Sequence, residues 1–188
     1  MTEVKVLIVG PQNSGKTALA NYIADAVQNA ENPAQAPTKP TVGARILEFD
    51  RQVKKGNQNA NVSVELWDVS GDRAYEGGWP AIQHGAMGCV FVFDAEKAGE
   101  EKELEQWHKW FAAPLGLKDT QCVIFGHRKS DGKVAKQTQA KALSKIQSVS
   151  TTLEENQKDI KDEFDRFLLH VTAAAEEMRA REEQNMLE

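Results

Sequence analysis

The hydrophobic residues of this chain form nearly continuous runs in several places. Such runs of five or six residues occur at Val4–Val9, Gly88–Phe93 and Gln121–Phe125. This pattern is typical of strands that are buried on both faces of a parallel sheet. A weaker segment of the same kind, Lys145–Val149, is predicted to be the last strand.

Other segments place apolar residues three or four positions apart, which is the spacing of one helix face. This spacing predicts helices at Lys16–Gln28, Glu100–Ala113 and Asp159–Glu183. The apolar stripe of the last helix is lost in the charged segment Ala173–Glu188. We therefore expect residues 159–188 to form a long C-terminal helix whose tip either frays or docks on a partner.

The remaining segments are two further strands and the loops beside them. Ala44–Phe49 and Val62–Trp67 are predicted strands, and the polar segment Arg51–Asn61 is predicted to be their hairpin connection. Asn29–Pro40 is rich in Asn, Ala and Pro and is predicted to be a loop. Asp68–Pro80 is expected to be a second loop with a functional role.

Strands that alternate with helices indicate an α/β fold in three layers. Because one hairpin joins two of the strands, the sheet is expected to carry one antiparallel edge. We predict a mixed, mostly parallel six-stranded sheet with helices on both faces. The chain has 188 residues, the length of one ordinary domain, so residues 1–188 are predicted to form a single domain.

Composition argues against several classes of function. The net charge of -5 predicts no bulk attraction to nucleic acid or anionic lipid. No apolar run reaches the roughly 18 residues of a membrane span. The chain begins Met1-Thr2-Glu3 and ends Asn185-Met186-Leu187-Glu188, without lipidation signals, so we expect no direct membrane anchor. Cys89 and Cys122 lie in apolar runs and are expected to be buried free thiols in the cytoplasm.

The segment with the clearest chemistry follows the first strand. Residues 10–17, Gly-Pro-Gln-Asn-Ser-Gly-Lys-Thr, match the P-loop pattern G-x-x-x-x-G-K-[ST] between a strand and a helix. The ammonium of Lys16 is expected to reach the β and γ phosphates of a nucleotide, and the hydroxyl of Thr17 to bind Mg²⁺. The alternative is a relic loop that no longer binds a nucleotide. The predicted phosphate-side residues are Gly10, Gln12, Asn13, Ser14, Gly15, Lys16, Thr17 and Ala18.

Two further segments are predicted to complete the site. Asp68 ends a strand and opens a D-x-x-G segment, where a carboxylate lies near the magnesium ion of a P-loop protein. The N–H group of Gly71 is expected to contact the γ-phosphate, and Thr41 to give magnesium a second hydroxyl. The alternatives are a simple turn for D-x-x-G and a simple strand start after proline for Thr41. The predicted metal ligands are Thr17, Thr41 and Asp68.

These segments, in this order, resemble the Ras/Rab superfamily of small GTPases. One branch is more similar than the others, the Rab-like small GTPases of the intraflagellar transport complex. The similar segments are Gly43–Phe49, Glu65–Asp68 with Gly71-Asp72, Trp79–Ala81, Asp119–Cys122 and Arg179–Glu183.

The resemblance implies a P-loop G-domain that binds GTP or GDP with Mg²⁺. It also implies a peripheral subunit of intraflagellar transport complex B, monomeric before assembly and docked on coiled-coil subunits of that complex. The implied location is the cilium or flagellum, its base and the cytoplasm. These properties rest on the resemblance and not on composition or spacing.

Two positions depart from a working small GTPase. Asp72 stands where an active enzyme has the glutamine that orients the attacking water. A carboxylate cannot donate a hydrogen bond to the γ-phosphate, and its negative charge opposes that of the phosphate. Gln12 would also crowd the path of an arginine finger. Both changes predict at most very slow hydrolysis, and the alternative is that Asp72 acts as a general base or Arg73 as a finger in cis.

The base-reading motif is also irregular. A typical member has N-K-x-D after its fifth strand, whereas residues 127–131 here are His-Arg-Lys-Ser-Asp. Lys129 and Asp131 fit the motif with a shift of one residue, whereas without the shift His127 replaces the asparagine. The alternative is a solvated basic loop. The last motif, S-A-K, has its nearest match at Ser150–Thr152, so we expect weak affinity and incomplete discrimination of GTP from ATP. The predicted base-side residues are His127, Lys129, Asp131, Ser150 and Thr151.

Three hypotheses follow for the function. The first is a regulatory binding module that docks on a coiled-coil partner when GTP orders the loops of Thr41 and Gly71. The second is an enzyme, either a slow GTPase that needs an external activator or an ATP-using P-loop protein. The third is a structural pseudo-GTPase. Trp107 is expected in the core, and Trp79 is expected either to pack inside or to anchor a partner.

Overall fold

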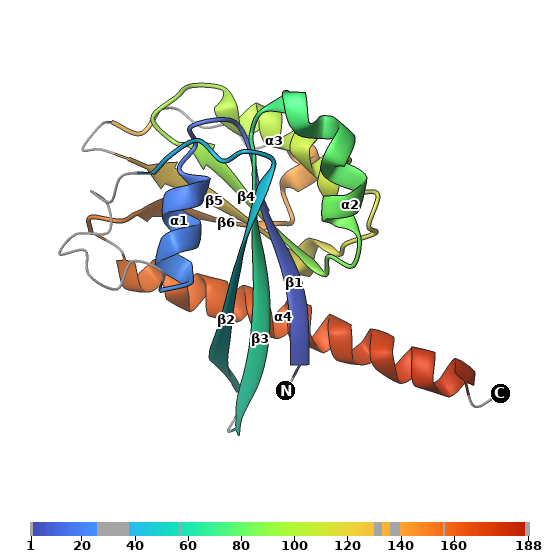
Figure 1. Cartoon of the computed structure of the whole chain (residues 1–188). Coiled ribbons are helices and arrows are strands. Elements are labelled where there is room, and N and C mark those ends of the chain that lie inside the picture. The colour runs from blue at the N-terminus through green and yellow to red at the C-terminus, as the bar shows by residue number, and fades with distance from the viewer. Residues whose placement is uncertain are drawn as a thin grey trace.

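The computed structural model describes residues 2–25, 38–56, 58–129, 133–135, 140–155 and 157–186. Its centre is a six-stranded sheet in the order β2-β3-β1-β4-β5-β6 (Figure 1). β2 pairs with β3 antiparallel, and the other described pairs are parallel. The predicted mixed, mostly parallel sheet is therefore confirmed. The strands are β1 (Thr2–Val9), β2 (Ala44–Lys55), β3 (Gln58–Val69), β4 (Gly88–Asp94), β5 (Cys122–Arg128) and β6 (Gln147–Thr152).

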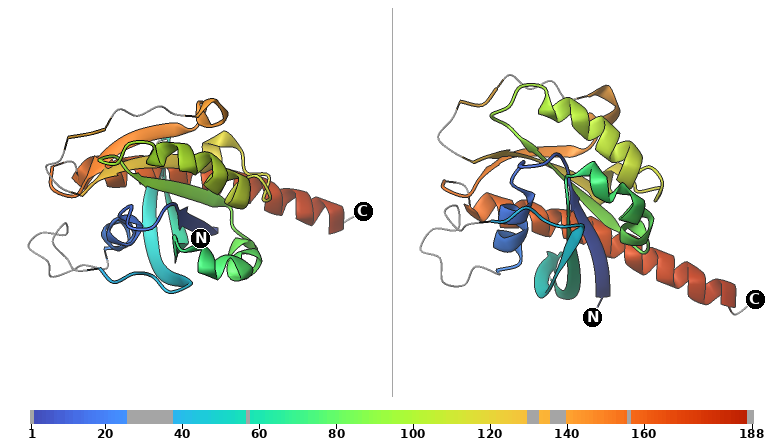
Figure 2. Two further views of the ribbon diagram at one scale, coloured as in Figure 1. Left: turned by 90° about the horizontal axis from the view of Figure 1, so that it is seen from above. Right: turned by 45° about the horizontal axis from the view of Figure 1, so that its top comes forward.

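Helices cover both faces of the sheet (Figures 1 and 2). One face carries α1 (Lys16–Ile23) and α4 (Gln157–Met186), whose buried side chains share one apolar cluster. The other face carries α2 (Trp79–Gln83) and α3 (Glu100–Phe111), which share a second cluster. The described residues also form the short 3-10 helices η2 (Arg73–Gly78), η3 (Asp119–Gln121) and η4 (Lys141–Leu143).

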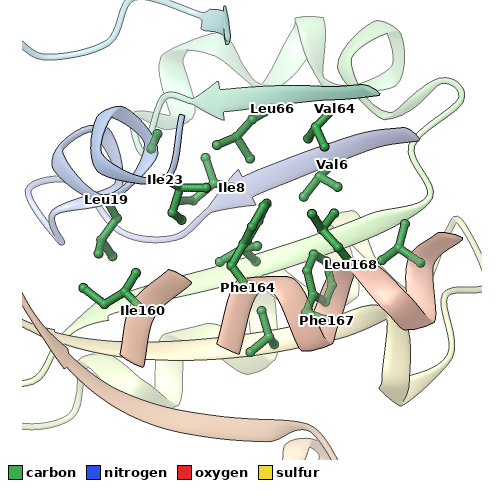
Figure 3. Close-up of a cluster of buried hydrophobic side chains, with 14 of the residues drawn as sticks. Val6, Ile8, Leu19, Ile23, Val64, Leu66, Ile160, Phe164, Phe167 and Leu168 are labelled. Carbon is green, nitrogen blue, oxygen red and sulfur yellow. The ribbon is translucent and has the colours of Figure 1, made fainter. Parts of the chain in front are cut away.

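The core between the sheet and α4 is close-packed (Figure 3). Side chains of a strand alternate between the two faces, so Val6 and Ile8 of β1 point toward α4 whereas Leu7 belongs to the opposite cluster. Phe164 of α4 is fully buried, and its ring centroid lies 5.8 Å from that of Phe167. Burying one such side chain stabilises the fold by about 1.5–3 kcal/mol.

Four aromatic rings tie α2 to α3 on the other face. The ring of Trp79 lies 4.9 Å from Phe111, 5.1 Å from Trp110 and 5.8 Å from Trp107, measured between centroids. Trp79 and Trp107 are only 7% and 3% exposed. Trp107 is therefore in the core as predicted, and for Trp79 the packing alternative holds in this structure.

The hairpin is longer than predicted. β2 and β3 continue to Lys55 and from Gln58, so most of the predicted connection Arg51–Asn61 is strand. Contacts with α4 explain this result. Arg51 donates a hydrogen bond of 2.7 Å to Asp165, and Val53 is 1% exposed. A single apolar residue among polar ones gives a weak strand pattern, and the packing against α4 outweighs it.

Other boundaries also differ from the prediction, most of them by one or two residues. α1 ends at Ile23 with Ala24 as its cap, and the predicted helical residues 26–28 lie outside the described residues. β5 continues to Arg128 and β6 to Thr152, because these strands pair with each other up to those two residues. Both extensions are polar, so the apolar pattern ends before the hydrogen-bonded ladder does.

The segment Asp68–Pro80, predicted to be a loop, contains regular structure. η2 begins after Asp72, whose side chain caps it, and α2 begins at Trp79. Both elements are too short to produce a recognisable helical repeat in the sequence.

α4 begins two residues earlier and ends three residues later than predicted. Its last buried residue is Ala175, and residues 176–186 are exposed. This exposed end of the helix projects beyond the sheet (Figure 1). None of the helices in the described part of the chain has the length and apolarity needed to cross a bilayer.

Candidate nucleotide-binding site

The predicted site lies at the carboxyl end of the sheet. β1 is central, pairs with β3 on one side and β4 on the other, and leads directly into residues 10–17. α1 follows on one face of the sheet and α3 lies on the other face. Open α/β sheets bind ligands at such a switch point, because the loops there leave a crevice.

A pocket of about 270 Å³ opens at this point. It brings together most of the predicted phosphate-side residues and the two loops that carry Thr41 and Gly71. Gly10 is not among the lining residues, although its carbonyl contacts Lys16. The pocket is lined by Gln12–Ala18, by Thr38–Val42, by Val69–Asp72 and by Tyr75.

Lys16 is a buried cation at the floor of the pocket. Its Nζ donates hydrogen bonds to the carbonyl oxygens of Gly10 at 2.9 Å and Pro11 at 2.6 Å. Burial lowers the pKa of Lys16 to about 8, against attraction from Asp68. The ammonium is therefore charged near neutral pH but poorly solvated, which favours an anion as its ligand.

Three oxygen atoms converge beside Lys16. Oγ1 of Thr17 donates to Oδ2 of Asp68 at 2.8 Å, Oγ1 of Thr41 donates to the same oxygen at 3.0 Å, and the two hydroxyls lie 3.0 Å apart. Asp68 is fully buried, and its Oδ1 has no hydrogen-bond partner among the described residues.

This cluster fits a magnesium ion. Mg²⁺ prefers oxygen ligands and is usually held by one or two carboxylates, hydroxyls and phosphate oxygens. Thr17, Thr41 and Asp68 supply two hydroxyls and one carboxylate, and the free Oδ1 calls for a further polar neighbour. A bound Mg²⁺ would neutralise negative charge on the phosphates, and the three side chains would hold it in place.

Two glycines allow the loops to meet. A Cβ atom on Gly71 would lie 2.5 Å from the backbone nitrogen of Gln12, so only glycine lets the D-x-x-G loop touch the P-loop. Gly15 has a φ of +93°, and a Cβ there would lie 2.3 Å from the His127 ring. A residue with a side chain would therefore clash at either position, so both must be glycine.

Asp72 and Arg73 are engaged with protein atoms. Oδ1 of Asp72 accepts a hydrogen bond of 2.9 Å from the N–H of Ala74 and so caps η2. The guanidinium of Arg73 lies 5.1 Å from the Trp110 ring and 3.0 Å from the Glu76 carboxylate. In this conformation both side chains contact residues in or beside η2.

A second pocket of about 220 Å³ adjoins the first and shares Asn13, Gly15, Ala18 and Thr38 with it. Lys129 lies at its edge. Nζ of Lys129 donates to the carbonyl oxygen of Asn13 at 2.6 Å and lies 2.8 Å from Oδ2 of the buried Asp94. Lys129 is thereby fixed against the P-loop. Asp131, the other half of the shifted motif, lies outside the described residues.

Ser150 and Thr151, which the sequence predicts on the base side, are not among the residues that line either pocket. Both lie within β6. Thr152, Leu153 and Glu154 line the second pocket instead. Thr152 is the last residue of the predicted match Ser150–Thr152, so the end of this segment borders the pocket.

His127 also lines this pocket, although it belongs to β5 and not to the predicted loop. Its Nδ1 lies 3.1 Å from Oγ1 of Thr151. Desolvation lowers the pKa of His127 to about 4, with a smaller opposing contribution from Asp94. The imidazole is therefore neutral near pH 7.

Acidification is expected to destabilise the fold through His127. The pKa is about 4 in the folded chain and ordinarily 6.5, so the unfolded chain binds more protons between these values. The contribution of the neutral His127 to the free energy of unfolding is present above pH 6.5. It is lost as the pH falls toward 4, and the loss is about 2 kcal/mol at pH 5. Urea unfolding at about pH 7 and pH 5 measures the loss, which His127→Asn should remove. An equal loss in that variant would contradict the assignment.

The chain is similar to several known proteins. The family model described as the Ras of Complex, Roc, domain of DAPkinase matches residues 5–131. The intraflagellar transport protein 22 homolog of Danio rerio is 34% identical over 190 residues and covers the whole of both chains.

Two crystal structures from T. brucei are also similar. The GTP-bound IFT22/74/81 structure is 30% identical, covers 93% of this chain and 97% of its own, and has a TM-score of 0.71. The GDP-bound IFT22 structure is 31% identical, covers 92% and 98%, and has a TM-score of 0.67. The match along the full length confirms the predicted resemblance. The chain belongs to the intraflagellar transport protein 22 family, a branch of the Ras-like small GTPases.

Proposed function

We propose that this chain is an atypical GTP-binding regulatory subunit of intraflagellar transport complex B. It docks on coiled-coil subunits of that complex in a nucleotide-dependent way and acts in the cilium or flagellum. The observation that carries the proposal is the convergence of Thr17, Thr41 and Asp68 beside Lys16. Relatives crystallised with GTP, with GDP and as the IFT22/74/81 complex support it.

Thr41 is the link between nucleotide and partner. Its hydroxyl already contacts Asp68, and it belongs to a described segment that leads directly into β2. A γ-phosphate with Mg²⁺ gives this segment and Gly71 contacts that a diphosphate lacks. The ordered segments then present one surface to a partner, since a ligand shifts an equilibrium only through such differential contacts.

Slow turnover is part of the proposal. The side chain of Asp72 caps η2 and cannot donate to a phosphate oxygen, so the chain holds its nucleotide state for long periods. The nucleotide is then a loading signal, and the partner reads which state is bound.

Thr17→Asn is expected to weaken binding to the coiled-coil partner at least about tenfold, because loss of the magnesium hydroxyl removes the GTP-ordered loops. The measurement is a titration of the purified chain, loaded with a GTP analogue, against homologues of the two partner proteins in the T. brucei complex. Fluorescent GTP, GDP and ATP analogues measure occupancy and base selectivity in the same samples.

Thr120→Asn is the matched control, because Thr120 is an exposed residue of η3, which precedes the amino end of β5, whereas the site lies at the carboxyl ends of the strands. It should leave both affinities unchanged. If Thr17→Asn lowers nucleotide occupancy and leaves partner affinity intact, the chain is a structural subunit and the switch proposal is wrong.

A further inference from the structure

Arg45 stands directly opposite the candidate metal ligand Asp68. The two residues are partners in the antiparallel ladder of β2 and β3, so their side chains leave the same face of the sheet. Nη2 of Arg45 lies 3.7 Å from Oδ2 of Asp68. The same nitrogen donates a hydrogen bond of 2.6 Å to Oδ1 of Asn21 in α1.

The surroundings of Asp68 make this guanidinium significant. Asp68 is fully buried, and a buried carboxylate without a nearby cation is strongly disfavoured. Its described neighbours Thr17 and Thr41 are neutral, so the positive charge comes from Lys16 and Arg45. Lys16 is also the residue expected to serve the phosphates, which leaves Arg45 as the cation aimed at the carboxylate alone.

Arg45 is at the same time able to leave. Its side chain is 42% exposed, and its distance to Asp68 is longer than a hydrogen bond. Asn21 holds the guanidinium in place from α1, the helix that begins at the P-loop. When another cation binds Asp68, the guanidinium of Arg45 can therefore move toward solvent without disturbing the core.

We propose that Arg45 is a positioning residue for the magnesium site, acting as counter-ion of Asp68 when Mg²⁺ is absent and opposing Mg²⁺ when it binds. It makes nucleotide binding less dependent on Mg²⁺ than the site would be without it. This inference rests on the proposed function, because it takes a nucleotide with Mg²⁺ as the ligand. Both effects have one physical cause, since two cations compete for one carboxylate.

The test compares the affinity for fluorescent GDP in saturating Mg²⁺ and in excess EDTA. The measured quantity is the ratio of the dissociation constant in EDTA to that in Mg²⁺. Arg45→Gln should raise this ratio about tenfold, a typical size for coupling between two ligands of one site. The GDP affinity should fall in EDTA, and the Mg²⁺ concentration needed to restore it should also fall.

Three further variants distinguish the effect of the charge of Arg45, the effect of its position and the effect of strand stability. Arg45→Lys keeps the charge and should leave the ratio closer to that of the unmodified chain. Asn21→Ala keeps Arg45 but removes its anchor, and should raise the ratio by a smaller factor. Arg51→Gln removes another arginine of β2, which pairs with Asp165 of α4 and not with the site, and should leave the ratio unchanged.

The results distinguish failure of the Arg45 inference from failure of the proposed function. If GDP binds and the ratio is the same in Arg45→Gln and the unmodified chain, the inference is wrong and the proposed function stands. If the unmodified chain binds no GDP in either condition, both fail. Should Arg45→Gln not fold, an unchanged ratio in Asn21→Ala overturns the inference and a raised ratio supports it.

Discussion

Lys16→Ala is expected to raise the dissociation constant of GTP by about 100-fold or more, and that of GDP, which has no γ-phosphate, by a smaller factor. The ammonium lies at the floor of the phosphate pocket and is the cation expected to reach the β and γ phosphates. Each charge-assisted hydrogen bond to a phosphate oxygen contributes about 1.5–3 kcal/mol, and two such bonds correspond to the stated loss. Titration with fluorescent nucleotides measures it.

The same substitution should leave the fold nearly intact, which separates lost binding from unfolding. The lowered pKa of Lys16 has desolvation as its first cause, so burying this charge costs stability in the absence of an anion. Removing the buried charge stabilises the fold, and this gain offsets the loss of the two hydrogen bonds from Lys16 to the carbonyls of Gly10 and Pro11. The control is Lys102→Ala, an exposed lysine of α3. Nucleotide affinities within about threefold of the unmodified chain would place the phosphate elsewhere.

Phe164→Ala is expected to lower the free energy of unfolding by about 3–5 kcal/mol. The Phe164 ring is fully buried between α4 and the sheet and lies 6.4 Å from Phe49 and 5.8 Å from Phe167 (Figure 3). Truncation removes its contacts and leaves a cavity that rigid strands on one side cannot fill. Urea unfolding with a common slope measures the difference.

Met178→Ala is the matched control for this core variant. Met178 lies on the same helix but is 52% exposed, beyond the last buried residue, Ala175. Its truncation should change stability by less than about 0.5 kcal/mol. A loss below about 1 kcal/mol in Phe164→Ala would mean that α4 contributes little to the core.

The features that the sequence predicted correctly share a local cause. β1 and β4 lie in the middle of the sheet, so they are largely buried on both faces and their residues form nearly continuous apolar runs. The P-loop is contiguous because its backbone must wrap one anion, which requires fixed glycines and a lysine within eight residues. Both signals are complete within a short window of sequence.

The features that the sequence could not predict depend on contacts between distant segments. The polar tip of the hairpin forms strands because Arg51 of β2 pairs with Asp165 of α4. These two residues are 114 positions apart in the sequence. β6 continues to Thr152 because β5 pairs with it that far. The sequence left open whether Trp79 packs inside or anchors a partner, and the rings of α3 that surround it show that it packs inside in this structure.

The sequence by itself therefore determined the α/β class, the P-loop and the types of residue that could hold phosphate and magnesium, because each depends on local pattern and chemistry. Only the tertiary structure decided which groups meet. It brought Thr17, Thr41 and Asp68 together from three segments, set Arg45 opposite that carboxylate, and fixed Lys129 between Asp94 and the P-loop. Register and loop path set these pairings, and both arise from packing of the whole chain.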